Sequence, residues 1–270
     1  MPKALKIHAL ELVRIIFSCL HKQKEDDRMY AIKAVGLVKK YKDVIAVNGV
    51  DLDIQMGELF SLLGVNGAGK TTTIKMLSCL IKPNSGVATV GGYSVIDEPQ
   101  KVKELIGVSP QETAIAPNLS VKENLELIAG IHGLSKERTN AKIAELTDLF
   151  DLGRVMSRKA GKLSGGWQRR VSIAMALISE PKILFLDEPT LGLDVIARQD
   201  MWQIIRSLRG RATVILTTHY MEEAEVLSDR VGIMKDGHLL AIGTPQELKE
   251  MTKTDNFEKA FIHVVKGVSR

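Results

Sequence analysis

One glycine-rich segment constrains the fold of this chain more than any other: Gly64-Val65-Asn66-Gly67-Ala68-Gly69-Lys70-Thr71. It follows an apolar run at residues 58–63 and precedes a predicted helix at residues 71–80, which is the context of a phosphate-binding loop. The glycines let successive backbone amides point inward around phosphate oxygens, and the following helix adds positive potential there. The sequence therefore predicts a nucleotide-binding α/β domain in which Lys70 reaches the outer phosphates and Thr71 binds Mg²⁺.

A second apolar run, residues 183–186, ends in the carboxylates Asp187 and Glu188. Such a run is typical of a buried parallel strand, and the carboxyl end of such a strand meets the ligand. We expect Asp187 to hold the magnesium ion and Glu188 to orient or deprotonate the attacking water. Adjacent residues on a strand face opposite sides of the sheet, so the two carboxylates need not share a role.

Strands and helices alternate on both sides of a helical middle. After the helical middle, strands are predicted at residues 182–186 and 213–217 and helices at 195–208 and 221–227, which implies parallel strands joined by crossover helices. A hairpin is predicted to turn at Asp236-Gly237. In the middle, residues 112–165 are predicted to be an inserted helical subdomain, in which Ser120 and Glu123 form a capping box.

The chain divides into an N-terminal extension (1–28), one nucleotide-binding domain (29–250) and a short C-terminal tail (251–270). The extension has the pattern of a short amphipathic helix, with apolar positions such as Leu10, Val13 and Phe17. Such a helix could lie on a membrane or a partner surface. A disordered or loosely docked tail is at least as well supported for a terminus. Glu11 and Arg14 interrupt the apolar run, which argues against a signal peptide.

The composition of the chain argues against nucleic acid as a partner and against a membrane-spanning segment. The formal charge is +5, from 37 basic and 32 acidic residues, and only 4% of residues are aromatic. Neither value indicates a nucleic-acid partner, which would favour a concentrated basic surface and rings for base stacking. Two cysteines fit a reducing compartment. No run reaches the roughly 18 to 20 apolar residues that span a bilayer, so a transport role needs a membrane partner.

The motifs and their order resemble the ATP-binding subunit of an ABC transporter from Tyr30 to about Leu248. Leu163-Ser164-Gly165-Gly166-Trp167-Gln168-Arg169-Arg170, here called the signature segment, matches the signature motif of that family. In the family this motif comes from one subunit and caps the nucleotide held by the phosphate loop of the other. Ser164, Gly165 and Gly166 open a predicted helix, so their amides and the serine hydroxyl can form an anion site.

The resemblance also implies a P-loop NTPase fold with a mixed sheet core, an antiparallel β subdomain and an inserted α-helical subdomain. It implies that Tyr41 stacks on adenine and that Asp194 lies in a loop crossing the dimer interface. It implies that His219 is a switch residue touching the terminal phosphate. It further implies that Gln111 contacts magnesium and water and links to the membrane partner.

Three remaining positions of the resemblance concern nucleotide contacts. Thr72 and Gln168 are implied to touch the nucleotide. Trp167 stands where the family often has glutamine or methionine, a departure that leaves the phosphate contacts intact. No catalytic position is missing, so we expect an active ATP hydrolase that uses ATP and Mg²⁺.

The function implied is an ATPase that powers transport from the cytoplasmic face of the membrane, with a second ATPase subunit and an integral-membrane permease as partners. The runs at residues 67–74 and 192–198 are similar to the exporter (ABC-2) branch with separate membrane subunits. An importer ATPase is the alternative. A soluble relative acting on ribosomes or DNA is less favoured, because the chain has one cassette, no heptads and few cysteines.

Overall fold

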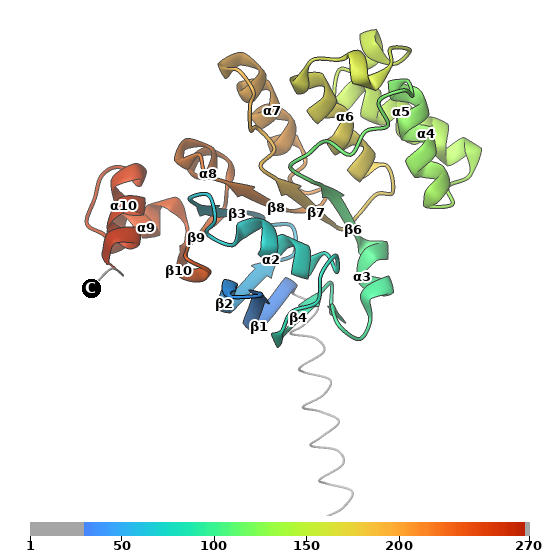
Figure 1. The fold of residues 1–270 in the computed structure, drawn as a ribbon. Helices are drawn as coiled ribbons and strands as arrows, with labels where there is room; N and C mark the ends of the chain where they lie inside the picture. The colour runs from blue at the N-terminus through green and yellow to red at the C-terminus, as the bar shows by residue number, and fades with distance from the viewer. Residues whose placement is uncertain (1–29, 268–270) are drawn as a thin grey trace, which may run out of the picture.

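The computed structural model describes residues 30–267, which fold around two sheets (Figure 1). The predicted extension 1–28 lies outside the described residues. The smaller sheet is antiparallel, with strand order β2-β1-β4-β5. Its strands are β1 (Tyr30–Tyr41), β2 (Val44–Gln55), β4 (Ser85–Val90) and β5 (Tyr93–Ser94).

The larger sheet has the order β10-β9-β3-β8-β7-β6, and every neighbouring pair is parallel except β9 with β10. Its strands are β3 (Leu59–Gly64), β6 (Ile106–Ser109), β7 (Ile183–Asp187), β8 (Thr213–Thr218), β9 (Arg230–Lys235) and β10 (His238–Gly243). The predicted hairpin turn is confirmed, because Asp236 and Gly237 both adopt positive φ (48° and 80°).

Every residue of β3, β7 and β8 is buried, because both faces of the larger sheet are covered. Alternate residues divide between two cores. Leu184 and Leu186 of β7 pack toward the helical subdomain, α6 (Gly165–Leu177) and α7 (Val195–Ser207). Ile183 and Phe185 pack toward the smaller sheet and α2 (Lys70–Leu77). The predicted α/β architecture, with an antiparallel β subdomain and a helical insertion, is confirmed.

The helices surround the larger sheet (Figure 1). They are α2 (Lys70–Leu77), α3 (Pro99–Leu105), α4 (Val121–Ile131), α5 (Lys136–Leu149), α6 (Gly165–Leu177), α7 (Val195–Ser207), α8 (Met221–Leu227), α9 (Pro245–Met251) and α10 (Phe257–Gly267), with short 3-10 turns η1 (Gly153–Val155) and η2 (Ala160–Lys162). The capping box predicted at the start of α4 is confirmed: Ser120 Oγ accepts from Glu123 N at 3.2 Å, and Ser120 N donates to Glu123 Oε2 at 2.7 Å. No helix of residues 30–267 is long and apolar enough to cross a membrane.

Helix α2 is shorter than the predicted range 71–80. It ends at Leu77, and Cys79 adopts the left-handed conformation with φ of 57°. The amide of Leu80 then donates to Lys75 O at 2.9 Å, which closes the last turn in the manner of a left-handed helix cap. Cys79 therefore lies just outside the helix and is only partly buried.

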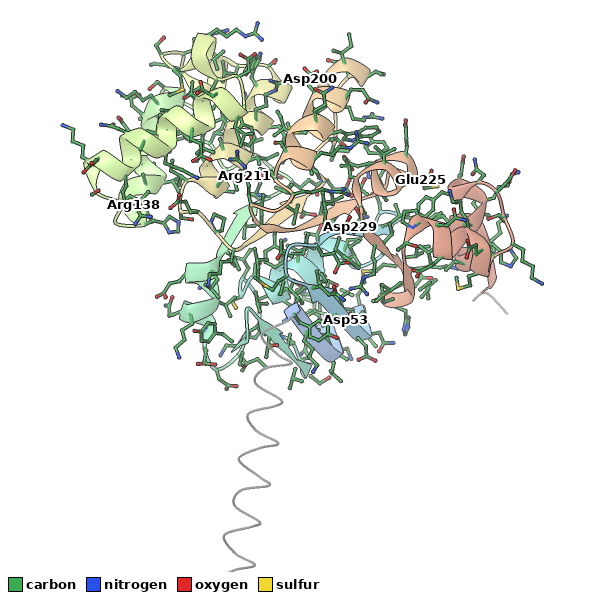
Figure 2. All side chains as sticks on the ribbon, turned by 180° about the vertical axis from the view of Figure 1, so that it is seen from behind. Asp53, Arg138, Asp200, Arg211, Glu225 and Asp229 are labelled. Atoms are coloured by element: carbon green, nitrogen blue, oxygen red, sulfur yellow. The ribbon has the colours of Figure 1, made fainter. Side chains whose placement is uncertain are left out.

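Charged pairs join the helical subdomain to the rest of the molecule. Arg138 of α5 pairs with Glu180 beyond α6 at 2.8 Å, and Arg211 beyond α7 pairs with Glu145 of α5 at 2.6 Å. Arg138 and Arg211 lie on the side seen in Figure 2. These pairs are largely exposed, so each adds little stability. They mark where α5 approaches the core.

The segment predicted as a short C-terminal tail contains helix α10. One face of this helix is apolar and buried, with Phe257, Ala260, Phe261 and Val264 at helical spacing. It packs with α8, α9 and the β9–β10 hairpin. Lys235 Nζ of β9 also donates to Val265 O at 2.9 Å. The C-terminal helix is thereby attached to the edge of the larger sheet.

Candidate active site

The phosphate loop, residues 64–71, runs from the end of β3 to the start of α2. Gly67 and Gly69 have φ of 81° and 105°, a region that favours glycine. A side chain at Gly69 would collide with the carbonyl oxygen of Ala46 in β2. The hairpin turn supports the loop from the other side, because Gly237 N donates to Ala68 O at 3.0 Å. The loop shape is therefore fixed by segments far away in the sequence.

Lys70 places a buried positive charge inside this loop. Its side chain is 6% exposed, and its Nζ donates to Gly64 O at 2.7 Å and to Val65 O at 3.2 Å. The same ammonium lies 3.4 Å from Glu188 Oε1. A buried lysine with these partners supplies a fixed cationic site for anions bound by the loop.

Asp187 and Thr71 come together at the mouth of the loop, as the sequence predicts. Thr71 Oγ1 donates to Asp187 Oδ1 at 3.0 Å, and the hydroxyl of Thr217 donates to the same oxygen. Asp187 is 5% exposed. A hydroxyl and a carboxylate beside a phosphate site are the donor types that Mg²⁺ takes from a protein when phosphates supply further ligands. The residues present therefore fit this ion.

Glu188 and His219 form a pair at the carboxyl ends of β7 and β8. Glu188 Oε2 lies 2.7 Å from His219 Nδ1, while its other oxygen faces Lys70. Glu188 has φ of 50°, an uncommon conformation for a residue with a side chain. Its amide donates to Thr217 O and Oγ1 at 3.2 and 3.0 Å, which holds it there. The carboxylate is thus fixed between a cation and an imidazole.

These groups line one cavity of about 480 Å³. Tyr41 stands at its rim, 44% exposed, with the ammonium of Lys39 5.4 Å from its ring centre. Gln111 lines the same cavity. The full lining is Tyr41, Ala46, Asn66, Gly67, Ala68, Gly69, Lys70, Thr71, Thr72, Gln111, Glu188, Leu191 and His219. A cavity lined by an aromatic ring, a phosphate loop and a paired carboxylate has the parts that bind a nucleoside triphosphate.

The signature segment lies outside this cavity. Ser164 is the N-cap of α6, and Gly165 begins the helix. Both residues are exposed. They border a different recess of about 370 Å³, lined by Arg154, Ser164, Gly166, Trp167, Arg170, Asp194, Ile196, Ala197 and Asp200. Asp194 caps α7 beside it, with Oδ1 accepting from Ala197 N at 2.9 Å. The structure therefore brings Ser164, Gly166 and Asp194 together, but apart from the phosphate loop.

A family model described as "ABC transporter" matches residues 47–191, more than half of the chain. The matched range contains the phosphate loop, the signature segment and the acidic strand end. The chain belongs to the ABC transporter ATP-binding family.

Relatives of this ABC ATPase include subunits with named roles. The Daunorubicin resistance ATP-binding protein DrrA3 of Streptomyces coeruleorubidus is 42% identical over 84% of this chain and 72% of its own length. The Nod factor export ATP-binding protein I of Burkholderia orbicola (strain AU 1054) is 42% identical over 78% of this chain and 70% of its own length.

Solved structures agree with the fold. An ATP-binding subunit of an ABC transporter has a TM-score of 0.79 at 27% identity and covers 87% of this chain and 99% of its own. A dimeric ATP-binding cassette in a post-hydrolysis state, with ADP and Pi bound, has a TM-score of 0.72 at 30% identity and covers 79% and 98%. This chain is accordingly an ATP-binding ATPase.

Gln168 and Trp167 behave differently within the signature segment of this ABC ATPase. The side-chain amide of Gln168 donates to Leu163 O at 3.0 Å, so it is engaged with the start of its own helix. The guanidinium groups of Arg154 and Arg170 each lie 4.9 Å from the centre of the Trp167 ring. Cation–π contacts on the ring fix its orientation beside the recess.

Sequence reasoning missed Arg169. Its guanidinium is 5% exposed overall and donates to Pro110 O at 2.6 Å and to Gln111 O. Burial lowers its pKa, and the carboxylates of Asp187 and Glu188 oppose that effect. Arg169 therefore ties the signature helix to the loop that holds Gln111. Its position four residues before buried Ile173 was the available signal.

Sequence reasoning also missed Glu223, a wholly buried carboxyl of α8. Burial raises its pKa most, and the nearby Glu188 raises it further, while the hydroxyls of Thr218 and Thr190 and the indole of Trp202 lower it. Its spacing of four residues before buried Leu227 placed it on the apolar face of the helix, which was the signal for a buried acid.

Proposed function

We propose that this ABC ATPase powers an exporter by ATP-dependent closure of two ATPase subunits coupled to a separate membrane permease. One observation carries the closure: the cavity with the phosphate loop and the recess with Ser164 are separate within one chain. The relatives named for daunorubicin resistance and for Nod factor export support the outward direction.

Within the phosphate-loop cavity, the paired groups have complementary roles in hydrolysis. Lys70 binds the outer phosphates from its place in the loop. Glu188 orients or deprotonates the attacking water, and His219, at 2.7 Å from its carboxylate, touches the terminal phosphate. The contact between the two side chains supports this arrangement, because a base must be held in one direction to act on one water.

Thr71, Asp187 and Gln111 hold magnesium in this proposal. The contact between Thr71 and Asp187 and the position of Gln111 on the cavity wall support it. When bound by these residues, Mg²⁺ would neutralise negative charge on the phosphates and on the leaving group. The protein would contribute a hydroxyl, a carboxylate and an amide oxygen.

The signature segment supplies the other side of the nucleotide. The exposed amides at the start of α6 and the Ser164 hydroxyl bind the terminal phosphate held by the partner subunit. Val195 and Ile196, at 72% and 76% exposed beside Asp194, provide apolar surface for the same contact. A nearly complete shift to the closed dimer needs about 5 kcal/mol, which several charge-assisted hydrogen bonds of about 1.5 to 3 kcal/mol can supply.

The permease docks on the helical side. Leu127 and Ile131 of α4 are 46% and 70% exposed. A groove of about 200 Å³ runs between β6, α4 and α6, lined in part by Ile128 and Met175. Gln111 follows β6 directly, so movement at the nucleotide reaches this surface over a short path. Docking there places the ATPase at the cytoplasmic face of the membrane.

Closure is tested with Glu188→Gln. We expect this variant to bind ATP, to lose hydrolysis and to accumulate as an ATP-bound dimer in size-exclusion chromatography with light scattering. The same variant with ADP, and the unmodified chain with ATP, are the controls and should stay monomeric. Hydrolysis at the unmodified rate would remove Glu188 from the role of base, and a monomer with bound ATP would overturn closure.

The coupling of the ATPase to a permease and the direction of transport are tested in membranes. The full chain should copurify with an integral-membrane protein, and Ile131→Asp should weaken that recovery while leaving basal ATP hydrolysis intact. With daunorubicin as the probe, inverted vesicles should accumulate the drug when ATP is added, but not with the Glu188→Gln subunit. ATP-driven loss of preloaded drug from inverted vesicles would indicate import instead.

A further inference from the structure

Glu223 is a buried carboxyl to which the proposed chemistry assigns no role. It lies in α8 and is 0% exposed. Its Oε1 accepts from Thr190 Oγ1 at 2.7 Å and from Trp202 Nε1 at 3.0 Å. Its Oε2 has no hydrogen bond of good geometry within residues 30–267, although the Thr218 hydroxyl is near enough to lower the pKa of the carboxyl. A buried carboxyl with one unpaired oxygen destabilises a fold relative to an apolar side chain of similar size. Packing alone therefore does not account for this residue.

The two groups that donate to Glu223 flank the loop that carries Asp194. Thr190 lies two residues after Glu188 and is wholly buried. Trp202 lies in α7, the helix that Asp194 caps. Leu191 to Asp194, between them, is mostly exposed. Thr190, just before this exposed loop, and Trp202, in the helix after it, thus donate to the same carboxylate oxygen.

Glu223 also faces the segment that carries His219. The hydroxyl of Thr218 lies close enough to lower the pKa of Glu223, and it accepts from Tyr220 N at 3.0 Å. Thr218 and Tyr220 are the two neighbours of His219 in the chain. The residues on both sides of His219 are therefore connected to Glu223: Thr218 lies beside its carboxyl, and Tyr220 donates to Thr218.

A second contact joins the same two segments nearer the surface. The guanidinium of Arg198, in the first turn of α7, lies 4.4 Å from the centre of the Tyr220 ring. The Tyr220 ring in turn lies 4.1 Å from the His219 ring. Movement of the N-terminal end of α7 consequently changes the surroundings of His219 both through Arg198 and through Trp202 and Glu223.

We propose that Glu223 is a positioning residue that ties the loop at Asp194 to the segment at His219, so that contact of the partner subunit with Asp194 aligns the Glu188–His219 pair. The proposal rests on the dimer closure described under the proposed function. In this proposal the Glu223 carboxyl connects the subunit contact at Asp194 with the Glu188 carboxylate, which acts on water.

The first test compares Glu223→Leu with Glu223→Gln. Leucine removes both hydrogen bonds of Oε1, and we expect kcat for ATP to fall about tenfold while the Kd for ATP stays within about twofold. Glutamine keeps an acceptor oxygen and should restore most of kcat. Leu227→Ala, a buried change on the same helix, is the matched control: it should lower the melting temperature but leave kcat within about twofold.

The second test asks whether Glu223 and Asp194 act as one unit. Asp194→Ala should lower kcat in the unmodified chain and have almost no further effect in Glu223→Leu, because the connection is already lost. Asp194→Ala with Tyr41→Ala is the control pair: one lowers kcat and the other raises KM, so their effects on kcat/KM should multiply. If Glu223→Leu does not fold, Thr190→Val and Trp202→Phe, which each remove one donor, replace it in the same cycle.

Two results overturn the proposal. One is a kcat for Glu223→Leu within about twofold of the unmodified chain, and the other is effects of Asp194→Ala and Glu223→Leu that multiply. The Glu188→Gln dimer separates this failure from failure of closure itself. If Glu188→Gln forms an ATP-bound dimer and the cycle shows no coupling, Glu223 alone is wrongly assigned. If no ATP-bound dimer forms, both the proposed dimer closure and the proposed role of Glu223 are wrong.

Discussion

The phosphate-loop side of this chain is buried and internally paired, whereas the signature side lies open at its surface. Lys70, Asp187 and Glu188 are each 5% exposed, and each has polar partners within the chain. Ser164 is exposed and makes no side-chain cap at the start of α6. This comparison supports the proposed function, in which one chain holds the nucleotide and the signature segment of a second subunit caps it.

The two sides also differ in whether their polar interactions form during folding or on contact with a second subunit. Burying a lysine and two carboxylates is tolerated only because they pair and accept hydrogen bonds, so this side is organised before ligand arrives. The signature side keeps its helix N-terminus and its apolar neighbours Val195 and Ile196 exposed. In the proposed closure its interactions would form only on contact with the second subunit, so their free energy would be available to drive that closure.

Removing Lys70 should have the largest effect, because it destroys the organised side. Lys70→Ala leaves Glu188 without its cation and removes the charge under the phosphates, so we expect kcat/KM to fall at least about a thousandfold. Isothermal titration should show ATP binding by the chain lost as well. Lys75→Ala, an exposed lysine of the same helix, is the control. If Lys70→Ala kept its affinity for ATP, the phosphate-loop side would not be the part of the chain that holds the nucleotide.

Blocking the open side should have the next largest effect, on hydrolysis alone. Ser164→Arg fills the exposed start of α6, so we expect kcat to fall about a hundredfold while the Kd of the monomer for ATP is unchanged. Stopped-flow measurement with a fluorescent ATP analogue separates these quantities. The comparison would need revision if nucleotide binding to the monomer fell together with kcat, since the two sides would then not be independent.

Arg169 connects the two sides, and its loss should have an intermediate effect. Arg169→Ala leaves the carbonyls of Pro110 and Gln111 without their buried donor, so we expect kcat to fall about tenfold with little change in ATP affinity. Arg138→Ala, which removes only an exposed ion pair, should leave kcat unchanged. An effect of Arg169→Ala confined to the melting temperature would reduce this arginine to a packing role.

Tyr41 should give the smallest effect, because it stands at the rim of the organised side. Tyr41→Ala removes ring stacking worth about 0.5 to 1.5 kcal/mol, so KM for ATP should rise about threefold to tenfold with kcat unchanged. Tyr41→Phe keeps the ring and should behave like the unmodified chain in the same steady-state assay. A change in kcat, or an unchanged KM, would mean that adenine does not lie on Tyr41.

The organised side was largely predictable from sequence, because its parts are consecutive residues. Gly64 to Thr71 and Ile183 to Glu188 each carry strand, turn and charge in one short run, so local pattern is enough. Arg169 and Glu223 were missed because their roles depend on carbonyls and hydroxyls contributed by other segments. The end of α2 was missed for a different reason: Cys79 adopts a left-handed conformation, which a cysteine in the sequence does not predict.

The C-terminal boundary shows the same limit. Residues 251–270 were predicted as a tail, yet the apolar face of α10 packs on α8 and the β9–β10 hairpin. Its amphipathic spacing was visible in the sequence. What the sequence could not show was that a complementary apolar surface, formed by segments tens of residues earlier, was available to cover it.

The strand order carries a consequence for synthesis of the chain on the ribosome. Strand β3, which leads into the phosphate loop, is made early, but both of its neighbours, β8 and β9, are made at least about 150 residues later. The turn that supports Ala68 follows β9. A nascent chain that stops before Thr213 therefore has its nucleotide motif without a sheet to hold it. Nucleotide binding is expected to begin only after nearly the whole chain has emerged, so ATP does not assist its early folding.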